Sequence, residues 1–302
     1  MSVLYTPTSL EKGLKTLFLQ HFSTEAALAP RIAHIESSDS DSEKYDWLGQ
    51  SPTMQQFLDE RRTIPLSNTS YSIENLTWEA TITVSRNDLA DNRTGSIQRR
   101  IQQMAATAAG HQNKLIINQL IDGTSATLGL CYDGTAMFGN SHPARGDEGG
   151  VSDNLLSGTG TTVAAVSADL ATAKATMLNF ANESSEPFFG DGVGSLAVVC
   201  SPSLEKVFRE TLNAGMISNT SNVQVGMADL IVSPRLSDVD DWYLLNTGSA
   251  RSLILQDREP LEFSALEGNS DSGFMRDQWV YGVRARYNVG VGFWQAGVKT
   301  VN

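Results

Sequence analysis

The sequence predicts an α+β fold, in which helices and strands follow one another without the regular βαβ rhythm of a parallel α/β protein. Two patterns carry this prediction: apolar residues recur at helical spacing in several segments and alternate with polar residues at strand spacing in others. The 302 residues, 40% of them hydrophobic and 19% charged, suffice for cores in about two domains.

The net charge of −12 disfavours a protein whose main task is to grip nucleic acid or a membrane surface, because phosphate groups attract clustered Lys and Arg. A protein that surrounds DNA without binding a specific sequence remains compatible with this charge. The two cysteines, Cys131 and Cys200, predict neither a metal site nor a disulfide framework, as in a reducing cytoplasm. No apolar run approaches the roughly 18 residues of a membrane helix.

An amphipathic helix on an N-terminal arm is predicted near the start of the chain. Its apolar face consists of Leu10, Leu14, Leu17, Phe18 and Phe22. The acidic, polar run of residues 36–43 that follows is typical of a flexible linker. We therefore expect the arm to stand apart from the body, with Leu14 and Phe18 covered by a neighbouring subunit. The alternative is that the arm folds back on its own domain.

A β-hairpin is predicted after the arm. Residues 76–85 alternate strictly between apolar and polar side chains, with Trp78 on the apolar face, and a partner strand is expected near residues 61–66. A two-stranded ribbon is marginal by itself. We therefore expect the hairpin to lie on another subunit, with Arg61, Arg62 and Trp78 among the contacts.

Three helices are predicted further along. The longest runs from about Thr94 to Gly123, and its apolar spacing is set by Ile97, Ile101, Met104, Ala108, His111 and Leu115. The second follows a cap at Thr161 or Thr162 and buries Val166, Leu170, Ala173, Met177 and Phe180. The third is expected to begin at Pro202.

A buried strand is expected at residues 196–200, and further strands are expected at residues 230–232, 242–245 and 252–255. The last strand, from Trp279 to Phe293, carries apolar odd-numbered residues that we expect to be buried. Its polar face holds Arg284 and Arg286, which are expected to meet carboxylates of the same or a neighbouring subunit. On this hypothesis, reversing the charge of either arginine impairs assembly more than folding.

His142 is the most tempting catalytic candidate, because Ser141 is adjacent and Asp133 is near in sequence. Adjacent Ser and His side chains diverge on an extended backbone, however, and no Gly-x-Ser-x-Gly elbow is present. We interpret His142 as a loop histidine that packs or hydrogen-bonds. A hydrolase that uses His142 with a nearby carboxylate remains an alternative.

The other candidate motifs also favour structure over chemistry. The glycines of residues 158–160 lack the preceding strand and the lysine of a phosphate-binding loop. The acidic residues from Asp39 to Glu43 lack the glycine and the final glutamate of an EF-hand. Residues 238–241 are expected to be a solvated acidic turn. The sequence thus predicts no catalytic residue, no metal site and no cofactor.

Several short segments, in this order, resemble the major head subunit of Mu-like phages and prophages. They are Tyr132-Asp133-Gly134 with Phe138 and His142-Pro143; Leu230-Ile231-Val232-Ser233-Pro234; Trp242-Tyr243-Leu244-Leu245; Leu253-Ile254-Leu255-Gln256; and Tyr281-Gly282-Val283-Arg284-Ala285-Arg286 followed by Gly290, Gly292 and Trp294. The resemblance is densest from about residue 120 to 296 and weak over residues 1–45.

The resemblance implies the Hong Kong 97-type capsid fold, which has an arm, an extended hairpin loop, a peripheral domain with a long spine helix, and an axial domain. On this chain, the arm is expected over residues 1–45 and the hairpin loop over 46–85. The peripheral domain is expected over residues 86–160 and 271–302, and the axial domain over 161–270.

The resemblance also implies a structural protein rather than an enzyme. Copies of the chain are expected to assemble as pentamers and hexamers into an icosahedral head in the bacterial host cytoplasm, around double-stranded DNA that is not read by sequence. Because the chain begins almost directly with the arm, a separate scaffold and maturation protease are expected. A portal protein is a further expected partner and a decoration protein is left open. An encapsulin-like compartment shell that holds cargo enzymes is an alternative.

Overall fold

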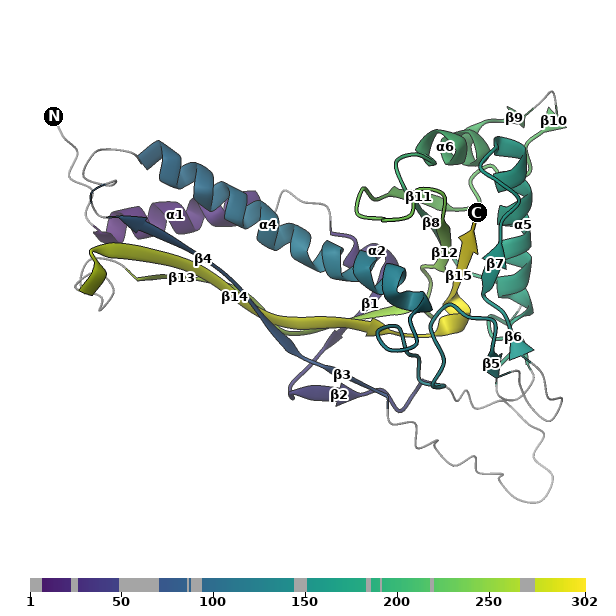
Figure 1. Ribbon diagram of the computed structural model, residues 1–302, viewed down its shortest axis with the longest axis horizontal. Coiled ribbons are helices and arrows are strands. Elements are labelled where there is room, and N and C mark those ends of the chain that lie inside the picture. The colour runs from purple at the N-terminus through teal and green to yellow at the C-terminus, as the bar shows by residue number, and fades with distance from the viewer. Residues whose placement is uncertain are drawn as a thin grey trace, which may run out of the picture.

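The computed structural model describes residues 7–22, 27–48, 71–85, 87, 94–143, 151–182, 186–190, 192–217, 220–266 and 275–302. These residues form two lobes, an elongated lobe built on a long sheet and a compact lobe at one end of it (Figure 1). Each lobe combines helices with a mixed sheet, which confirms the predicted α+β class.

The elongated lobe is organised by a four-stranded sheet in the order β1-β13-β14-β4. Its strands are β1 (Ala33–Ser37), β13 (Leu253–Leu266), β14 (Gln278–Val291) and β4 (Leu76–Ser85). β1 runs parallel to β13, and the other neighbours are antiparallel. The predicted final strand is thus the central β14, and its odd-numbered residues from Trp279 to Val291 are buried as expected.

Two helices cover one face of this sheet, α1 (Pro7–Phe22) and the 28-residue α4 (Thr94–Ile121). At about 1.5 Å per residue, α4 is about 42 Å long and spans most of the lobe. The shared core is formed by Leu14, Phe18, Val84, Ile97, Ile101, Met104, Ala105, Phe263, Trp279, Tyr281 and Val283. Most of these residues belong to the apolar faces predicted from periodicity, whereas Ala105 and Phe263 were not predicted.

The acidic run after the arm is ordered, so the predicted flexible linker is wrong. Following α2 (Ala29–Ile32) and β1, the chain turns into β2 (Ser42–Lys44), which pairs with β3 (Ser72–Glu74). The carboxylate of Glu43 accepts hydrogen bonds from the Ser38 hydroxyl at 2.8 Å and the Asp39 backbone N–H at 3.0 Å. These bonds, with those from Ser40, hold the pKa of Glu43 below its ordinary value.

The compact lobe contains a five-stranded sheet in the order β11-β8-β12-β15-β7. Its strands are β11 (Asp229–Val232), β8 (Leu196–Cys200), β12 (Trp242–Asn246), β15 (Gly297–Val301) and β7 (Leu155–Ser157). Every residue of β8 and β12 is buried, as continuous apolar runs predict for strands covered on both faces.

Two helices pack on this sheet, α5 (Val163–Asn179) and α6 (Glu205–Asn213). The five apolar residues predicted for the second helix are all buried, and the Thr162 hydroxyl caps α5 by accepting from the Ala165 backbone N–H at 3.3 Å. α6 begins three residues later than predicted, because residues 202–204 form a turn. Short elements complete the lobe: η1 (Asp122–Thr124), β5 (His142–Pro143), β6 (Val151–Ser152), β9 (Met216–Ile217), β10 (Thr220–Ser221) and η3 (Trp294–Ala296).

Strand pairing divides the chain between the two lobes at other residues than the predicted domain bounds. β13 was assigned to the axial segment 161–270, but it pairs with β14 along nearly its whole length in the elongated lobe. Conversely, β15 and β7 were assigned to the peripheral segments and lie in the compact sheet. β4, which was assigned to the hairpin loop, pairs with β14 in the elongated lobe. The predicted partner strand at residues 61–66 lies outside the described residues.

Candidate functional site

The arm residues predicted to contact a neighbour are buried within the chain itself. Leu14 is 2% exposed and Phe18 is fully buried, and the Phe18 ring lies 5.2 Å from that of Phe263 on β13. The prediction that these two side chains await another subunit is therefore wrong. The alternative, in which the arm packs on its own domain, is the one observed. The sheet and α4 provide the apolar surface that covers α1, and the local sequence pattern of the arm does not show that surface.

Trp78 is also held by its own chain. Its indole N–H donates to the Tyr287 carbonyl at 2.9 Å, and its ring lies 4.5 Å from that of His111 on α4. His111 Nδ1 in turn lies 2.9 Å from the Tyr287 hydroxyl, and burial lowers the pKa of His111. Through these contacts, Trp78 links β4 to α4 and to β14. Arg61 and Arg62, the other predicted contacts of this region, lie outside the described residues.

Arg284 and Arg286 find carboxylates on the same chain. Arg286 contacts Asp41 at 3.1 Å and Glu259 at 3.3 Å. Arg284 also pairs with Glu259, and Arg258 pairs with Asp41 at 2.9 Å. The hydrogen bond from Arg286 is the main reason that the pKa of Asp41 lies below its ordinary value. The network ties the turn before β2 to β13 and β14, so it first serves the subunit's own fold.

This placement changes the expected result of charge reversal. Arg286→Glu should lower the melting temperature of the isolated subunit more than Arg284→Glu, because the Arg286 side chain is 17% exposed and meets two carboxylates. The Arg284 side chain is 52% exposed and meets one. Thermal unfolding followed by circular dichroism measures both. Equal melting temperatures with loss of assembly in both variants would restore the original hypothesis of an inter-subunit role.

His142 is a buried structural histidine. Its Nδ1 lies 2.7 Å from Asp133 Oδ2, its Nε2 lies 3.3 Å from the Met137 carbonyl, and its ring stacks on Trp294 at 4.1 Å. Burial alone would raise the pKa of Asp133, but the hydrogen bonds from His142 and Thr135 hold it below its ordinary value. Ser141 is exposed while His142 is fully buried, so the two side chains diverge as predicted.

The acidic residues before β12 are not all solvated, contrary to the prediction. Asp241 is 3% exposed and its carboxylate lies 2.9 Å from the ammonium group of Lys299 on β15. The same ammonium group lies 5.5 Å from the centre of the Tyr243 ring. β15 pairs with β12, so the pairing of two strands from distant parts of the chain creates this ion pair.

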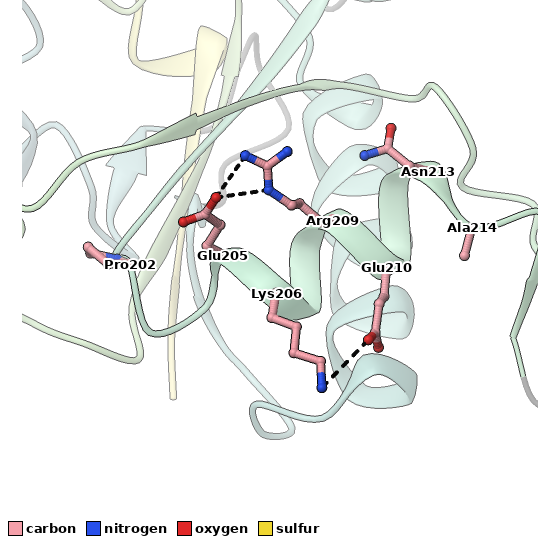
Figure 2. Close-up of a pocket in the computed structure, with 7 residues that line it drawn as sticks. All are labelled: Pro202, Glu205, Lys206, Arg209, Glu210, Asn213 and Ala214. Carbon is pink, nitrogen blue, oxygen red and sulfur yellow. Dashed lines mark hydrogen bonds and ion pairs between the residues drawn. The ribbon is translucent and has the colours of Figure 1, made fainter.

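An open hollow of about 620 Å³ lies beside α6, but it lacks the features of an active site. Its charged side chains neutralise one another along the helix, since Arg209 pairs with Glu205 at 2.7 Å and Lys206 with Glu210 at 3.9 Å (Figure 2). These are ordinary pairs one helical turn apart on an exposed face. No pair of groups there is poised for proton transfer or nucleophilic attack.

A second hollow, of about 380 Å³, is exposed and is lined by Lys174 and Gln224 as well as by apolar side chains. We name its apolar part the α5 patch, and it consists of Ala171, Ala175, Leu178, Val223, Val225 and Met227. Val223 is 86% exposed and Val225 is 51% exposed, which is costly for β-branched apolar side chains. α5 lies on the side of the compact lobe that faces away from the elongated lobe (Figure 1). This patch was not predicted from the sequence, although the Val223-Gln224-Val225 run is a signal for it.

No cluster of three or more His, Cys, Asp or Glu side chains suited to a metal ion occurs in the described part of the chain. No helix among the described residues is long and apolar enough to cross a membrane.

Sequence comparison places the chain among phage head proteins. The family model of the Mu-like prophage major head subunit gpT matches residues 8–167 and 237–301. The chain is 25% identical over 292 residues to the Mu-like prophage FluMu major head subunit of Haemophilus influenzae, covering 95% of this chain and 71% of that protein. It is 26% identical over 302 residues to the major capsid protein of Escherichia phage Mu, covering 98% of this chain and 74% of that protein.

Structural comparison agrees with the sequence. The procapsid protein of bacteriophage JBD30 has a TM-score of 0.55 and 24% identity, with 99% of this chain and 76% of that chain covered. This likeness shows that the fold is of the Hong Kong 97 capsid type. Because the family model matches most of the chain, this protein belongs to the Mu-like prophage major head subunit family and is a structural subunit of a phage head rather than an enzyme.

Proposed function

We propose that copies of this subunit assemble as pentamers and hexamers into an icosahedral head that encloses double-stranded DNA. Membership of the head-subunit family supports this proposal, as does the net charge of −12, which disfavours tight adhesion of DNA to the wall. Identical subunits that repeat one modest contact many times gain a strong assembly without any single tight interface.

The observation that carries this proposal is the α5 patch. Exposed apolar hollows of this kind mark protein interfaces, because water contact with them is unfavourable. We assign the compact lobe to the axial domain and the α5 patch to contacts between subunits of one ring. The elongated lobe is assigned to the peripheral domain, which now includes β13 and β4, and is proposed to contact neighbouring subunits. Arg61 and Arg62 remain proposed contacts.

Placing a carboxylate in the α5 patch tests this assignment. Val223→Asp should leave the subunit folded, because the side chain is 86% exposed, but reduce the yield of closed shells by at least about tenfold, the effect of a cost of about 1.4 kcal/mol per contact. The yield is measured by sedimentation and negative-stain microscopy. The matched control is Leu128→Asp, at an apolar residue that is 66% exposed outside the patch. Full shell yield from Val223→Asp would contradict the assignment.

The head also needs partners beyond copies of this chain. We propose a separate scaffold, a maturation protease and a portal protein, on the basis of the family alone. A decoration protein gains support from bacteriophage JBD30, whose capsid is decorated with minor capsid protein trimers. Co-purification of shells from a phage lysate, followed by mass spectrometry, identifies which of these partners are bound.

A further inference from the structure

The long helix α4 of the elongated lobe differs in charge from the rest of the chain. The whole chain is acidic, with 34 Asp and Glu residues against 22 Lys and Arg residues. The 28 residues of α4 nevertheless include no Asp or Glu, whereas they include Arg99, Arg100 and Lys114. The net charge of the chain therefore conceals a basic segment.

The three cations of α4 lie on one exposed side of the helix. At about 100° per residue, Arg99, Arg100 and Lys114 fall within an arc of about 100° around the helix axis, and all three are exposed. Ile97 and Ile101 lie on the other side and are buried in the core shared with the sheet that α4 covers (Figure 1). Arg99 and Lys114 are separated by about 22 Å along the axis. The cations therefore form a row along the outer surface of the lobe.

A fourth cation extends this row beside the compact lobe. Burial lowers the pKa of His111 on α4, and the positive charges of Lys114 and Arg235 lower it further. Arg235 is exposed in the turn that follows β11, so this turn places its charge near the C-terminal half of α4. No carboxylate of the described residues offsets these charges at His111. We call Arg99, Arg100, Lys114 and Arg235 the basic stripe.

The basic stripe contrasts with the arginines of the long sheet. Arg258, Arg284 and Arg286 each form an ion pair with Asp41 or Glu259 of the same chain. Within the described ranges of the chain, no member of the basic stripe forms an ion pair with a carboxylate. The positive charge of the stripe is thus not used to hold this part of the subunit together.

The side chains around the basic stripe favour a nucleic-acid backbone over a protein surface as its partner. The exposed residues of α4 that lie between the cations are polar or small, namely Gln103, Ala106 and Thr107. None of the large apolar side chains that are exposed in the described part of the chain belongs to α4. Protein interfaces bury apolar and aromatic anchors at their centre, whereas contacts with phosphate need cations and polar donors. The stripe has the second composition and lacks the first.

We propose that the basic stripe binds the phosphate backbone of the enclosed double-stranded DNA, so that the α4 side of the elongated lobe is the inner face of the shell. The contact is independent of base sequence, because phosphate oxygens carry no sequence information. It weakens as the salt concentration rises, because binding releases the cations that surround DNA. This inference rests on the DNA-enclosing head proposed above and names the surface that meets the DNA. The acidic net charge limits adhesion elsewhere on the subunit.

Acetylation of lysines in full heads, and in the same heads after release of their DNA, tests the proposal directly. Lys114 should react about tenfold more slowly in full heads, the effect of a phosphate that occupies it about nine-tenths of the time. Lys206, whose side chain is 85% exposed on α6, is the control and should react equally in both preparations. Equal reactivity of Lys114 in full and emptied heads, whether fast or slow, would overturn this proposal. The proposed function would still stand, because such heads contain DNA.

Removing the charges of the stripe gives an independent test on isolated subunits. The probe is a fluorescent mixed-sequence DNA duplex, and its binding is followed by anisotropy between about 50 and 200 mM salt. The triple variant Arg99→Gln, Arg100→Gln and Lys114→Gln should make the slope of log affinity against log salt concentration shallower by about 2.7, or about 0.9 per cation. The matched control is Lys206→Gln with Arg209→Gln, which removes exposed cations that already have partners on α6 and should leave the slope unchanged. An unchanged slope in the triple variant, or a wild-type subunit that does not bind the duplex at about 50 mM salt, would refute the proposal.

Shell assembly by the triple variant separates DNA from a protein partner. Because the three replaced side chains are exposed, this variant should keep the wild-type melting temperature and form empty shells in normal yield. Loss of shells at an unchanged melting temperature would show that the stripe meets an acidic surface of another protein chain, and would overturn the proposal. Absence of shells from the wild-type chain would count instead against the proposed function.

Discussion

Replacing His142 by alanine is expected to lower the free energy of unfolding by about 3–5 kcal/mol, the range for removing a buried ring together with its hydrogen bonds. The ring is fully buried and stacks on Trp294, and both of its nitrogens have partners. Its loss leaves a cavity and removes the partner of Oδ2 of the Asp133 carboxylate, whose side chain is 8% exposed. Urea denaturation of isolated subunits measures this change.

The matched control for this variant is His34→Ala. The His34 side chain is 44% exposed and pairs only with Glu36, so its loss should change stability by less than about 1 kcal/mol. If the two variants were equally stable, the structural role assigned to His142 would be wrong. A hydrolytic activity that disappears in His142→Ala while shells still form would instead revive the enzyme alternative.

The His142 cluster also predicts a dependence of stability on pH. The pKa of Asp133 in the folded state lies below its ordinary value of 3.8. A carboxyl group with a depressed pKa contributes stability that is present above the ordinary value and is lost as the pH falls through the folded value. The difference in stability between the wild-type chain and His142→Ala should therefore shrink below about pH 4.

Lys299→Met should destabilise the compact lobe by about 3–5 kcal/mol, because it leaves a buried carboxylate without its partner. The Lys299 and Asp241 side chains are 11% and 5% exposed, and their charged groups lie 2.9 Å apart. The pair joins β15 to the start of β12. Chemical denaturation followed by tryptophan fluorescence provides the measurement, since Trp242 is fully buried beside this pair.

Two further variants make the test specific. Lys206→Met removes the partner of Glu210 on α6, where the side chains are 85% and 48% exposed, and should cost less than about 1 kcal/mol. The double variant Lys299→Met with Asp241→Leu removes both buried charges and should recover much of the lost stability. A double variant as unstable as Lys299→Met alone would show that the cost is lost packing rather than an unpaired charge.

The periodicity of the sequence predicted most of the elements correctly. The spacing from Ile97 to Leu115 identified α4, the buried face of α5 was predicted residue by residue, and the odd-numbered face of β14 is buried as expected. These patterns are readable because each element buries one side, and a buried side recurs at the period of its own backbone. The ordered series of short motifs from Tyr132 to Trp294 likewise identified the family.

Other features depended on which elements meet, and this the local pattern does not contain. α1 looks unpartnered in the sequence, yet Leu14 and Phe18 are buried against α4 and β13. For Arg284 and Arg286 the sequence left open whether the carboxylates belong to the same or a neighbouring subunit, and strand pairing and a turn bring Glu259 and Asp41 of the same chain to them. Asp241 was predicted to be solvated, but its carboxylate is buried and pairs with Lys299 on β15.

Apolar periodicity and motif order are properties of the chain, and they were enough to predict the fold class, most helices and strands, and the family of this head subunit. Which apolar faces are already covered within the subunit became known from the packing of the elements. The reason is that exposure depends on residues far apart in sequence: β4 pairs with β14, which lies about 200 residues later in the chain, and the fold of the compact lobe leaves Val223 exposed beside α5.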